Sequence, residues 1–383
     1  MTTATGGTPQ ISTQPRCRED QRFLFCTFVW MTSSVVEGVR QAQRVFCLSH
    51  PKPDGDAVGS LLGLYHGLTA LGKQVWVALP DPVPTYLSFL PGADKVWSWT
   101  EASDRLVQAA EQADLFFCVD FGRWDRIAPE LQALIDPDRL VWVDHHADSE
   151  PLSRRWNIWD PAAAATCELL YAEVLAPLYA AYAASLPMPA RIALYTGLLT
   201  DTGGFRFRSV RPFTLRIAAD LIEPPFPLES VHHYVFQRKK LSTLQLHSHL
   251  IQTGLRRMGD LPALVLPVEA ATLEAFGATW EDIETLPTQL LALEGTLLVA
   301  VIKEYPEAVR ISLRSVGDFP CHELAKEFDV GGGHRNAAGA TLYRPFAEAV
   351  AFTEHLIQTK YADSLREHYR AFLAKLELQE QFG

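Results

Sequence analysis

The sequence predicts an α/β protein with a doubly wound, mainly parallel sheet, joined by a helical connector to a smaller α/β domain. Short apolar runs alternate with longer helical patterns between residues 44 and 200, and a second strand-rich section begins at residue 263. Strands that alternate with helices favour a parallel sheet with helices on both faces. The length of 383 residues also suits two domains.

Five apolar runs in the first half of the chain are predicted to be buried strands. They lack strict alternation, as expected of strands that are covered on both faces. The runs are VFCLSH (45–50), VWVAL (75–79), KVWSW (95–99), LFFCVD (115–120) and LVWVDHH (140–146). Helical patterns occupy residues 55–72, which close on Gly72, and then residues 166–184 and 190–200.

The second half begins with a mostly helical stretch that has a proline-rich break at 223–227. Strand patterns follow at 263–269, 297–305, 309–316 and 339–344, with a helix over 321–328 and a glycine-rich run at 329–339. The expected boundaries are a disordered extension over 1–40, a first domain over 41–212, a helical connector over 213–257, a second domain over 258–346 and a helical tail over 347–383.

The composition excludes several classes of protein. A formal net charge of −11 argues against a protein that binds long nucleic acid along a basic surface, but it is compatible with a local basic pocket. Six cysteines without a CxxC pair favour free thiols and a reducing cytoplasm, with Cys47, Cys118 and Cys167 expected to be buried. No apolar run approaches the roughly 20 residues that cross a membrane.

Polar clusters follow three of the predicted strands. SHPKPDGDAVGS follows the first strand, VDFG closes the fourth and VDHH closes the fifth. Ligands of open α/β sheets bind at the carboxyl ends of the strands. The three clusters are therefore expected to converge on one site.

The residue types in these clusters indicate metal binding. His50, Asp54 and Asp56 lie within one strand-to-helix turn, where they either converge on a ligand or cap the helix. Asp120 and the triplet at 144–146 favour the ligand, because acidic and imidazole groups gathered at adjacent strand ends need a cation. Such ligands suit Mn²⁺, with Mg²⁺, Co²⁺ or Zn²⁺ as competitors. The set is too large for one structural zinc ion, and two ions can clamp an in-line phosphoryl displacement.

Four motifs and a glycine run resemble those of the DHH phosphoesterase superfamily. The motifs are His50-x-x-x-Asp54-x-Asp56, Asp120, Asp144-His145-His146 and Asp201, and GGGH at 331–334 is similar to the run of the DHHA1 substrate-binding domain. The resemblance spans roughly residues 44–345. The compact layout is similar to that of bacterial nanoRNases, which hydrolyse short oligonucleotides and remove the 3′-phosphate of 3′-phosphoadenosine 5′-phosphate.

The resemblance implies a role for each residue of the motifs. One ion would be held by His50, Asp54 and Asp120, and the other by Asp56, Asp120, His145 and Asp201, with Asp120 as the bridge. His146 would face the scissile phosphate and Asp144 would orient the site, so Asp120, Asp144 and His146 are the expected catalytic residues. From its position alone, Asp201 is compatible with an ordinary helix C-terminal turn. Thr166 and Glu168 are expected to pack beneath the metals.

Basic residues and glycines are the expected substrate ligands. They are Arg206, Arg314, Gly331, Gly332, Gly333, His334 and Arg335. The glycine run is either a flexible turn between a helix and a strand or a backbone nest that cups a phosphate. Arg206 either neutralises phosphate near the metals or belongs to a solvated strand edge. Val330 stands where the family usually has a glycine, which leaves the loop tighter or shifted.

These observations predict a cytoplasmic enzyme in which a hydroxide activated by two divalent ions attacks phosphorus, with Mn²⁺ expected and Mg²⁺ or Co²⁺ as alternatives. The expected substrates are short oligonucleotides or 3′-phosphoadenosine 5′-phosphate. The protein is expected to be a monomer or a homodimer and to have no membrane partner. The alternatives are a cyclic- or linear-dinucleotide phosphodiesterase, a single-strand exonuclease resembling RecJ, and a non-catalytic nucleotide-binding module. The GGGH run argues against an inorganic pyrophosphatase.

Overall fold

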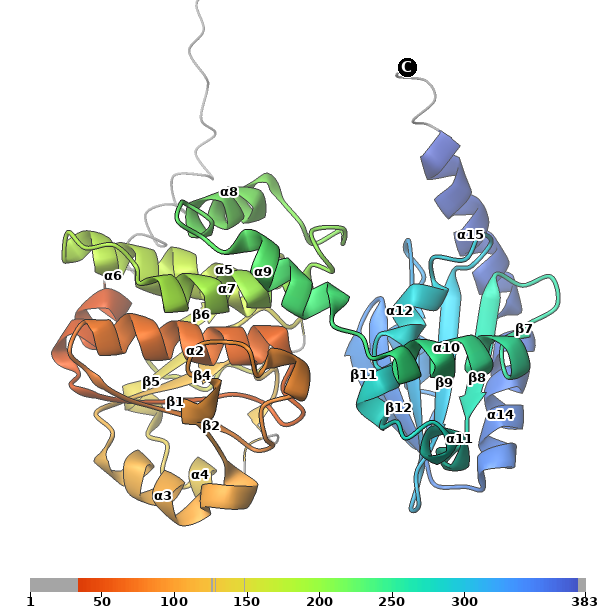
Figure 1. Ribbon diagram of the computed structural model, residues 1–383, viewed down its shortest axis with the longest axis horizontal. Helices are drawn as coiled ribbons and strands as arrows, with labels where there is room; N and C mark the ends of the chain where they lie inside the picture. Colours follow the sequence, from red (N-terminus) through yellow and green to blue (C-terminus); the bar gives the residue numbers. More distant parts are fainter. Residues whose placement is uncertain (1–33, 125–126, 128, 148, 378–383) are drawn as a thin grey trace, which may run out of the picture. The chain divides into compact units, whose positions relative to one another are not determined.

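The structure, a computed structural model, describes residues 34–377 apart from 125–126, 128 and 148. The chain divides between Gln237 and Arg238 into two compact units, and each is described by itself (Figure 1). Residues 34–41 form a helix, whereas the rest of the expected N-terminal extension lies outside the described residues. None of the helices in the described part of the chain has the length and the apolar character of a membrane span.

The first unit contains a six-stranded sheet in which every neighbouring pair of strands is parallel. The strand order is β3-β2-β1-β4-β5-β6. The strands are β1 (Arg44–Leu48), β2 (Gln74–Leu79), β3 (Val96–Ser98), β4 (Leu115–Val119), β5 (Leu140–Asp144) and β6 (Trp156–Trp159). The first five match the apolar runs, which confirms the predicted fold class. The pattern misses β6, because this strand is short and follows two arginines.

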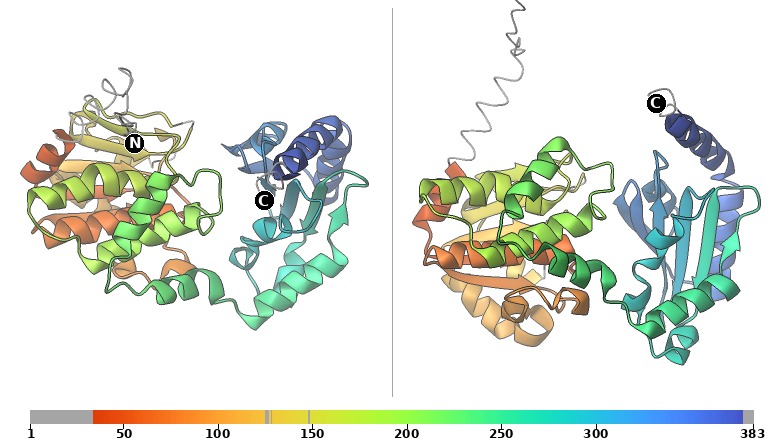
Figure 2. Two further views of the ribbon diagram at one scale, coloured as in Figure 1. Left: turned by 90° about the horizontal axis from the view of Figure 1, so that it is seen from above. Right: turned by 45° about the horizontal axis from the view of Figure 1, so that its top comes forward.

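Helices cover both faces of this sheet (Figure 2). One face packs against α2 (Gly55–Ala70), α5 (Thr166–Leu169) and α7 (Met188–Asp201), and the other against α3 (Trp99–Gln112) and α4 (Pro129–Gln132). Within β1, Val45 and Cys47 belong to one core and Phe46 and Leu48 to the other. Apolar side chains therefore point both ways, which explains the missing alternation.

The helix expected over 166–184 is helical without a break over residues 166–181. It consists of α5, a π-helical segment (Leu170–Leu175) and α6 (Ala176–Ala181). The unit ends with α8 (Pro212–Leu221), α9 (Leu228–His232) and a π-helical segment (His233–Gln237). Single 3₁₀ turns occupy Thr85–Leu87, Ala93–Lys95 and Pro137–Arg139.

The second unit contains a six-stranded mixed sheet in the order β11-β12-β10-β9-β8-β7. Its strands are β7 (Arg256–Arg257), β8 (Ala263–Val268), β9 (Leu298–Glu304), β10 (Val309–Ser315), β11 (Val330–His334) and β12 (Ala337–Leu342). One face packs against α10 (Leu241–Thr253), α11 (Ala270–Ala275), a 3₁₀ turn (Trp280–Ile283) and α12 (Leu286–Leu290). The other packs against α13 (Cys321–Ala325), α14 (Phe346–Gln358) and α15 (Ala362–Glu377).

The glycine run forms strand β11, so the two predicted conformations, a flexible turn and a backbone nest, are both wrong. β11 pairs antiparallel with β12, and Gly332 lies opposite Gly339. Packing requires Gly331, because a Cβ there would lie 1.7 Å from the carbonyl oxygen of Ala325. A Cβ at Gly332 would meet nothing within 4 Å. The fold itself therefore does not demand a glycine at this second position.

Candidate metal centre

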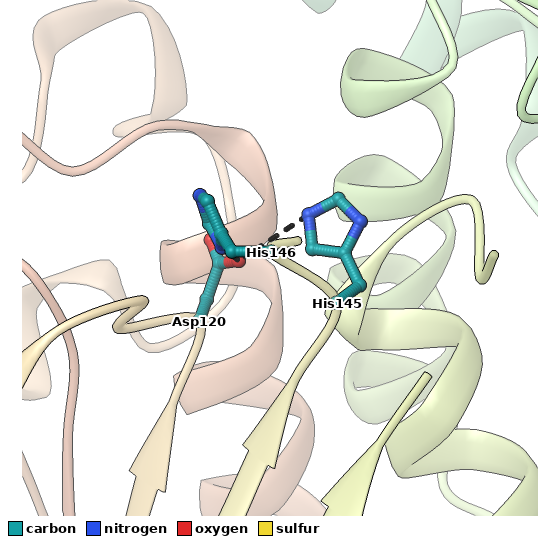
Figure 3. A group of neighbouring side chains, drawn as sticks. All are labelled: Asp120, His145 and His146. Carbon is teal, nitrogen blue, oxygen red and sulfur yellow. Dashed lines mark ion pairs between the residues drawn. The ribbon is translucent and has the colours of Figure 1, made fainter. Parts of the chain in front are cut away.

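Three of the predicted site residues lie where adjacent parallel strands end (Figure 3). Asp120 directly follows β4, and His145 and His146 directly follow β5. Because β4 and β5 are neighbours in the sheet, their carboxyl ends bring Asp120 beside both imidazoles. The two histidine rings meet edge to face, with their centroids 5.0 Å apart.

The turn after β1 brings His50, Asp54 and Asp56 to the same edge of the sheet. Asp54 is the N-cap of α2, and its Oδ1 accepts hydrogen bonds from the backbone N–H groups of Asp56 and Ala57. The same oxygen lies 4.0 Å from Nε2 of His50. Helix capping and membership of the polar cluster, which the sequence leaves as alternatives, therefore occur together.

The six predicted metal ligands fall into two groups. Within each group, the ligand atoms lie within 4.8 Å of one another. One group is His50, Asp54 and Asp120, and the other is Asp56, His145 and Asp201. In the second group, His145 Nε2 lies 3.5 Å from Asp201 Oδ2 and 3.9 Å from Asp56 Oδ2. A third group, Asp120, His145 and His146, overlaps with these two.

Asp120 joins the two groups through its two carboxylate oxygens. Its Oδ2 lies 3.4 Å from His50 Nε2, whereas its Oδ1 lies 3.6 Å from His145 Nε2. The residue is 1% exposed and has a φ of 60°. A non-glycine residue rarely adopts this left-handed conformation, and such strain is concentrated at functional sites. The two oxygens of Asp120 therefore face the two ligand groups.

The N-terminus of α5 supports two of the carboxylates. Asp56 accepts the N–H of Thr166 on Oδ2 at 2.6 Å and the N–H of Cys167 on Oδ1 at 2.9 Å. The Thr166 hydroxyl donates to Asp120 Oδ1 at 3.0 Å. Thr166 therefore contacts the site directly, which is a closer involvement than packing beneath it.

Asp144 holds His146 in one orientation. Its Oδ1 accepts hydrogen bonds from Nδ1 of His146 at 2.7 Å and from the His146 backbone N–H at 3.0 Å. Its Oδ2 accepts from Ser149 Oγ at 2.8 Å, and Ser149 in turn accepts from Trp142 Nε1 at 3.0 Å. Burial acts to raise the pKa of Asp144, but these partners and the charge of His146 lower that pKa to about 2. Because Nδ1 of His146 carries the proton in this bond, Nε2 is the nitrogen left for a substrate.

The charged forms of two carboxylates in the cluster are disfavoured. Burial, followed by the charge of Asp56, raises the pKa of Asp120 well above its ordinary value. Burial also raises the pKa of Asp201 to about 7. Four carboxylates and two imidazoles make up the two groups, and this mixed oxygen and nitrogen donor set is one that divalent transition ions accept. The residues present therefore fit two divalent cations.

The segment after Asp201 contains one predicted substrate residue and one that the sequence does not single out. Nε of Arg206 donates to the carbonyl oxygen of Gly203, which holds this side chain on its own loop. Nη2 of Arg211 donates to Oε1 of Glu168 at 2.6 Å, and its Nη1 donates to Asp160 at 3.3 Å. Arg211 therefore ties the segment after Asp201 to α5.

In the second unit, the predicted substrate residues lie on β10, on β11 and in the turn after β11. Arg314 is on β10, and its Nη1 donates to the carbonyl oxygen of Leu313. Nε and Nη2 of Arg335 both donate to the carbonyl oxygen of Asp318. The backbone of His334 ends β11, and its side chain lies outside what the structure describes.

Comparison with known proteins shows which family has this combination of units. The model of the DHH family, N-terminal domain, matches residues 44–198, and that of the DHHA1 domain matches residues 263–359. A relative from Thermus thermophilus, the bifunctional oligoribonuclease and PAP phosphatase NrnA, is 31% identical over 78% of this chain and 84% of its own length. This chain belongs to the DHH family.

Two further similarities agree with membership of the DHH family. The Bacillus subtilis protein of the same name is 27% identical over 82% of this chain and 94% of its own length. The crystal structure of an exopolyphosphatase-related protein from Bacteroides fragilis matches with a TM-score of 0.81 at 28% identity, covering 88% of this chain and 98% of that chain. The predicted resemblance to the DHH and DHHA1 domains is thereby confirmed.

Several residues that shape this DHH-family site carry little signal in the sequence. Ser149 and Trp142 complete the hydrogen-bond chain to Asp144 but belong to no metal-binding residue type. Arg211 lies 43 positions from its partner Glu168. A buried glutamate inside an apolar helix was the available signal, because such a residue needs a cationic partner.

Proposed function

We propose that this chain is a metal-dependent phosphoesterase that hydrolyses short oligonucleotides and 3′-phosphoadenosine 5′-phosphate. The observation that carries the proposal is the position of Asp120, whose two oxygens face two ligand groups while His146 is held beside them. The names of the Thermus thermophilus and Bacillus subtilis relatives support the substrate class. The net charge of −11 suits a small substrate better than long nucleic acid.

We assign two divalent cations, with Mn²⁺ as the proposed ion, to the two ligand groups. One would be held by His50, Asp54 and Asp120, and the other by Asp56, Asp120, His145 and Asp201. When bound, such ions supply positive charge that stabilises a phosphoryl transition state and lowers the pKa of water. Thr166 would keep Asp120 in place by donating to its Oδ1.

His146 is proposed to act on the substrate through Nε2. Burial opposes a charged imidazole, but the hydrogen bond and charge of Asp144, followed by the charge of Asp120, outweigh burial and raise the pKa of His146. When it is protonated at Nε2, this imidazole can donate to a phosphate oxygen or to the departing alkoxide. Ser149 and Trp142 would act indirectly, by fixing the carboxylate that orients this ring.

Strands β10, β12 and β11 of the second unit are proposed to seat a phosphate or a base edge. Arg314, Gly332 and Gly339 lie on one face of these strands, and a Cβ on either glycine would meet no atom closer than 3.9 Å. Burial lowers the pKa of Arg314. In the described part of the chain, no carboxylate forms an ion pair with this guanidinium. An anionic ligand would provide the partner that it lacks.

The proposal is tested by an Asp120→Ala variant assayed with Mn²⁺ on a dinucleotide and on 3′-phosphoadenosine 5′-phosphate. We expect turnover to fall at least about a thousandfold, since removing a unit of the catalytic machinery has effects of this order, while circular dichroism stays unchanged. Asp94→Ala removes an exposed acid that pairs with Lys95 and serves as the matched control. Wild-type turnover in the Asp120→Ala variant would contradict the assignment. Hydrolysis of cyclic dinucleotides alone, or of long single strands alone, would favour the alternative substrates.

A further inference from the structure

Trp159 differs from the other tryptophans of the chain in its exposure. The sequence contains nine tryptophans, and among those that the structure describes only Trp159 is classed as exposed, at 44%. Its neighbour Trp156 on the same strand is 3% exposed. A partly exposed indole keeps apolar surface in water, and a ligand that covers this surface gains binding free energy.

The place of Trp159 in the fold is beside the proposed catalytic histidine. Trp159 is the last residue of β6 and lies in register with Asp144, the last residue of β5. Its indole Nε1 donates to the carbonyl oxygen of His146 at 2.8 Å. The hydrogen bond fixes one edge of the indole on the backbone of the residue that is proposed to face the phosphate.

The indole of Trp159 has no stacking partner among the described residues. Within the described residues, no aromatic ring or guanidinium stacks on Trp159, whereas Trp156 is covered by Arg155 at 4.3 Å and Trp280 stacks on Tyr305 at 4.7 Å. The Nε1 of Trp159 thus has its hydrogen-bond partner, while the residue is 44% exposed. This combination is the one by which proteins bind nucleobases in single strands, because every base has a π face.

We propose that Trp159 is a substrate-binding residue whose exposed indole stacks on the nucleobase next to the scissile phosphate. The inference rests on the proposed function, because it presumes a phosphate beside His146. In a nucleotide, only the sugar separates the phosphate from the base, so a phosphate at His146 brings a base to the neighbourhood of Trp159. This stacking platform, the indole of Trp159, would bind any base regardless of its identity. It would therefore favour nucleotides over other phosphoesters.

The test compares Trp159→Ala and Trp159→Phe with wild type on two matched substrates, a dinucleotide and its analogue with both bases removed. We expect Trp159→Ala to raise KM for the dinucleotide about tenfold, the order of one lost stacking contact, while kcat/KM for the analogue stays at the wild-type value. Trp159→Phe should restore most of the affinity. Tyr182→Ala is the matched control, because Tyr182 is 43% exposed and stacks with Arg40, which precedes β1 and therefore lies toward the amino ends of the strands, away from the site at their carboxyl ends.

A second measurement does not depend on turnover. Calorimetric binding of AMP and of ribose 5-phosphate with Mn²⁺ present should show that Trp159→Ala weakens AMP alone, and Mn²⁺ affinity reports whether the centre is intact. Equal effects on base-containing and base-free probes, or no effect on either, would overturn the platform while leaving the phosphoesterase proposal in place. A wild-type protein that neither hydrolyses the dinucleotide nor binds AMP would overturn the proposed function and the platform with it.

Discussion

Replacing Arg211 with methionine tests the energetic importance of the buried ion pair behind the metal centre. Glu168 is 0% exposed, and its two carboxylate oxygens accept hydrogen bonds from Arg211 Nη2 and Thr214 Oγ1, each at 2.6 Å. Arg211→Met leaves this carboxylate buried with one hydroxyl as its partner. Breaking a buried pair in this way costs about 3–5 kcal/mol of unfolding free energy. We expect the lower end, because the Arg211 side chain is 35% exposed and water reaches it.

The assay is urea unfolding of the full chain in EDTA, following the transition of the first unit. Arg154→Met serves as the control, because Arg154 and its partner Asp138 are both mostly exposed and their pair should contribute little. The double variant Arg211→Met, Glu168→Met removes the stranded charge and should regain much of the loss. An Arg211→Met variant that is no less stable than Arg154→Met would refute the reasoning.

Three further predictions concern the glycine strand, the second-unit arginine and pH. Gly331→Ala should destabilise the second unit, because its Cβ would meet the backbone of α13. Gly332→Ala should have the stability of wild type in urea unfolding but bind AMP more weakly. Equal stability of the two variants would contradict this packing difference. Arg314→Ala should raise KM on nucleotides without changing the Mn²⁺ content measured by elemental analysis, and loss of metal would argue against a pure substrate role. Burial raises the pKa of Asp201 to about 7, and carboxylates outweigh burial to raise that of His145 to about 9. Both groups bind protons more tightly in the folded state, so the Tm in EDTA should fall as the pH rises, between 3.8 and about 7 through Asp201 and between 6.5 and about 9 through His145. Mn²⁺ should reduce this fall, and a Tm that rises over this pH range would contradict the electrostatic argument.

The sequence predicts the first unit well because its signals are local and repeated. Each apolar run is long enough to be recognised as a buried strand, and the carboxyl ends of parallel strands necessarily share one edge of the sheet. This rule alone brings His50, Asp120 and His145 together. Placing Asp201 beside them depends on how α7 packs against α2, which no local pattern specifies, and the family resemblance supplied that position.

Other features depend on tertiary context and escape the sequence pattern. Strand β6 exists because Val141 to Asp144 of β5 present a free edge for residues 156–159, not because of its own composition. The glycines of β11 are predicted from the sequence to form a flexible turn or a backbone nest, yet the antiparallel partner β12 makes them a strand. The exposure of Trp159 likewise follows from its place at the end of an edge strand.

The central claim is that the cluster around Asp120 holds ions that enable hydrolysis of small nucleotide phosphoesters. The most direct measurement is the release of mononucleotides from a dinucleotide, and of inorganic phosphate from 3′-phosphoadenosine 5′-phosphate, by wild-type protein with Mn²⁺ and with EDTA. We predict turnover with Mn²⁺ and its loss in EDTA, restored when Mn²⁺ is returned. Tight nucleotide binding with no hydrolysis under any of these conditions would contradict the claim and identify a nucleotide-binding module instead.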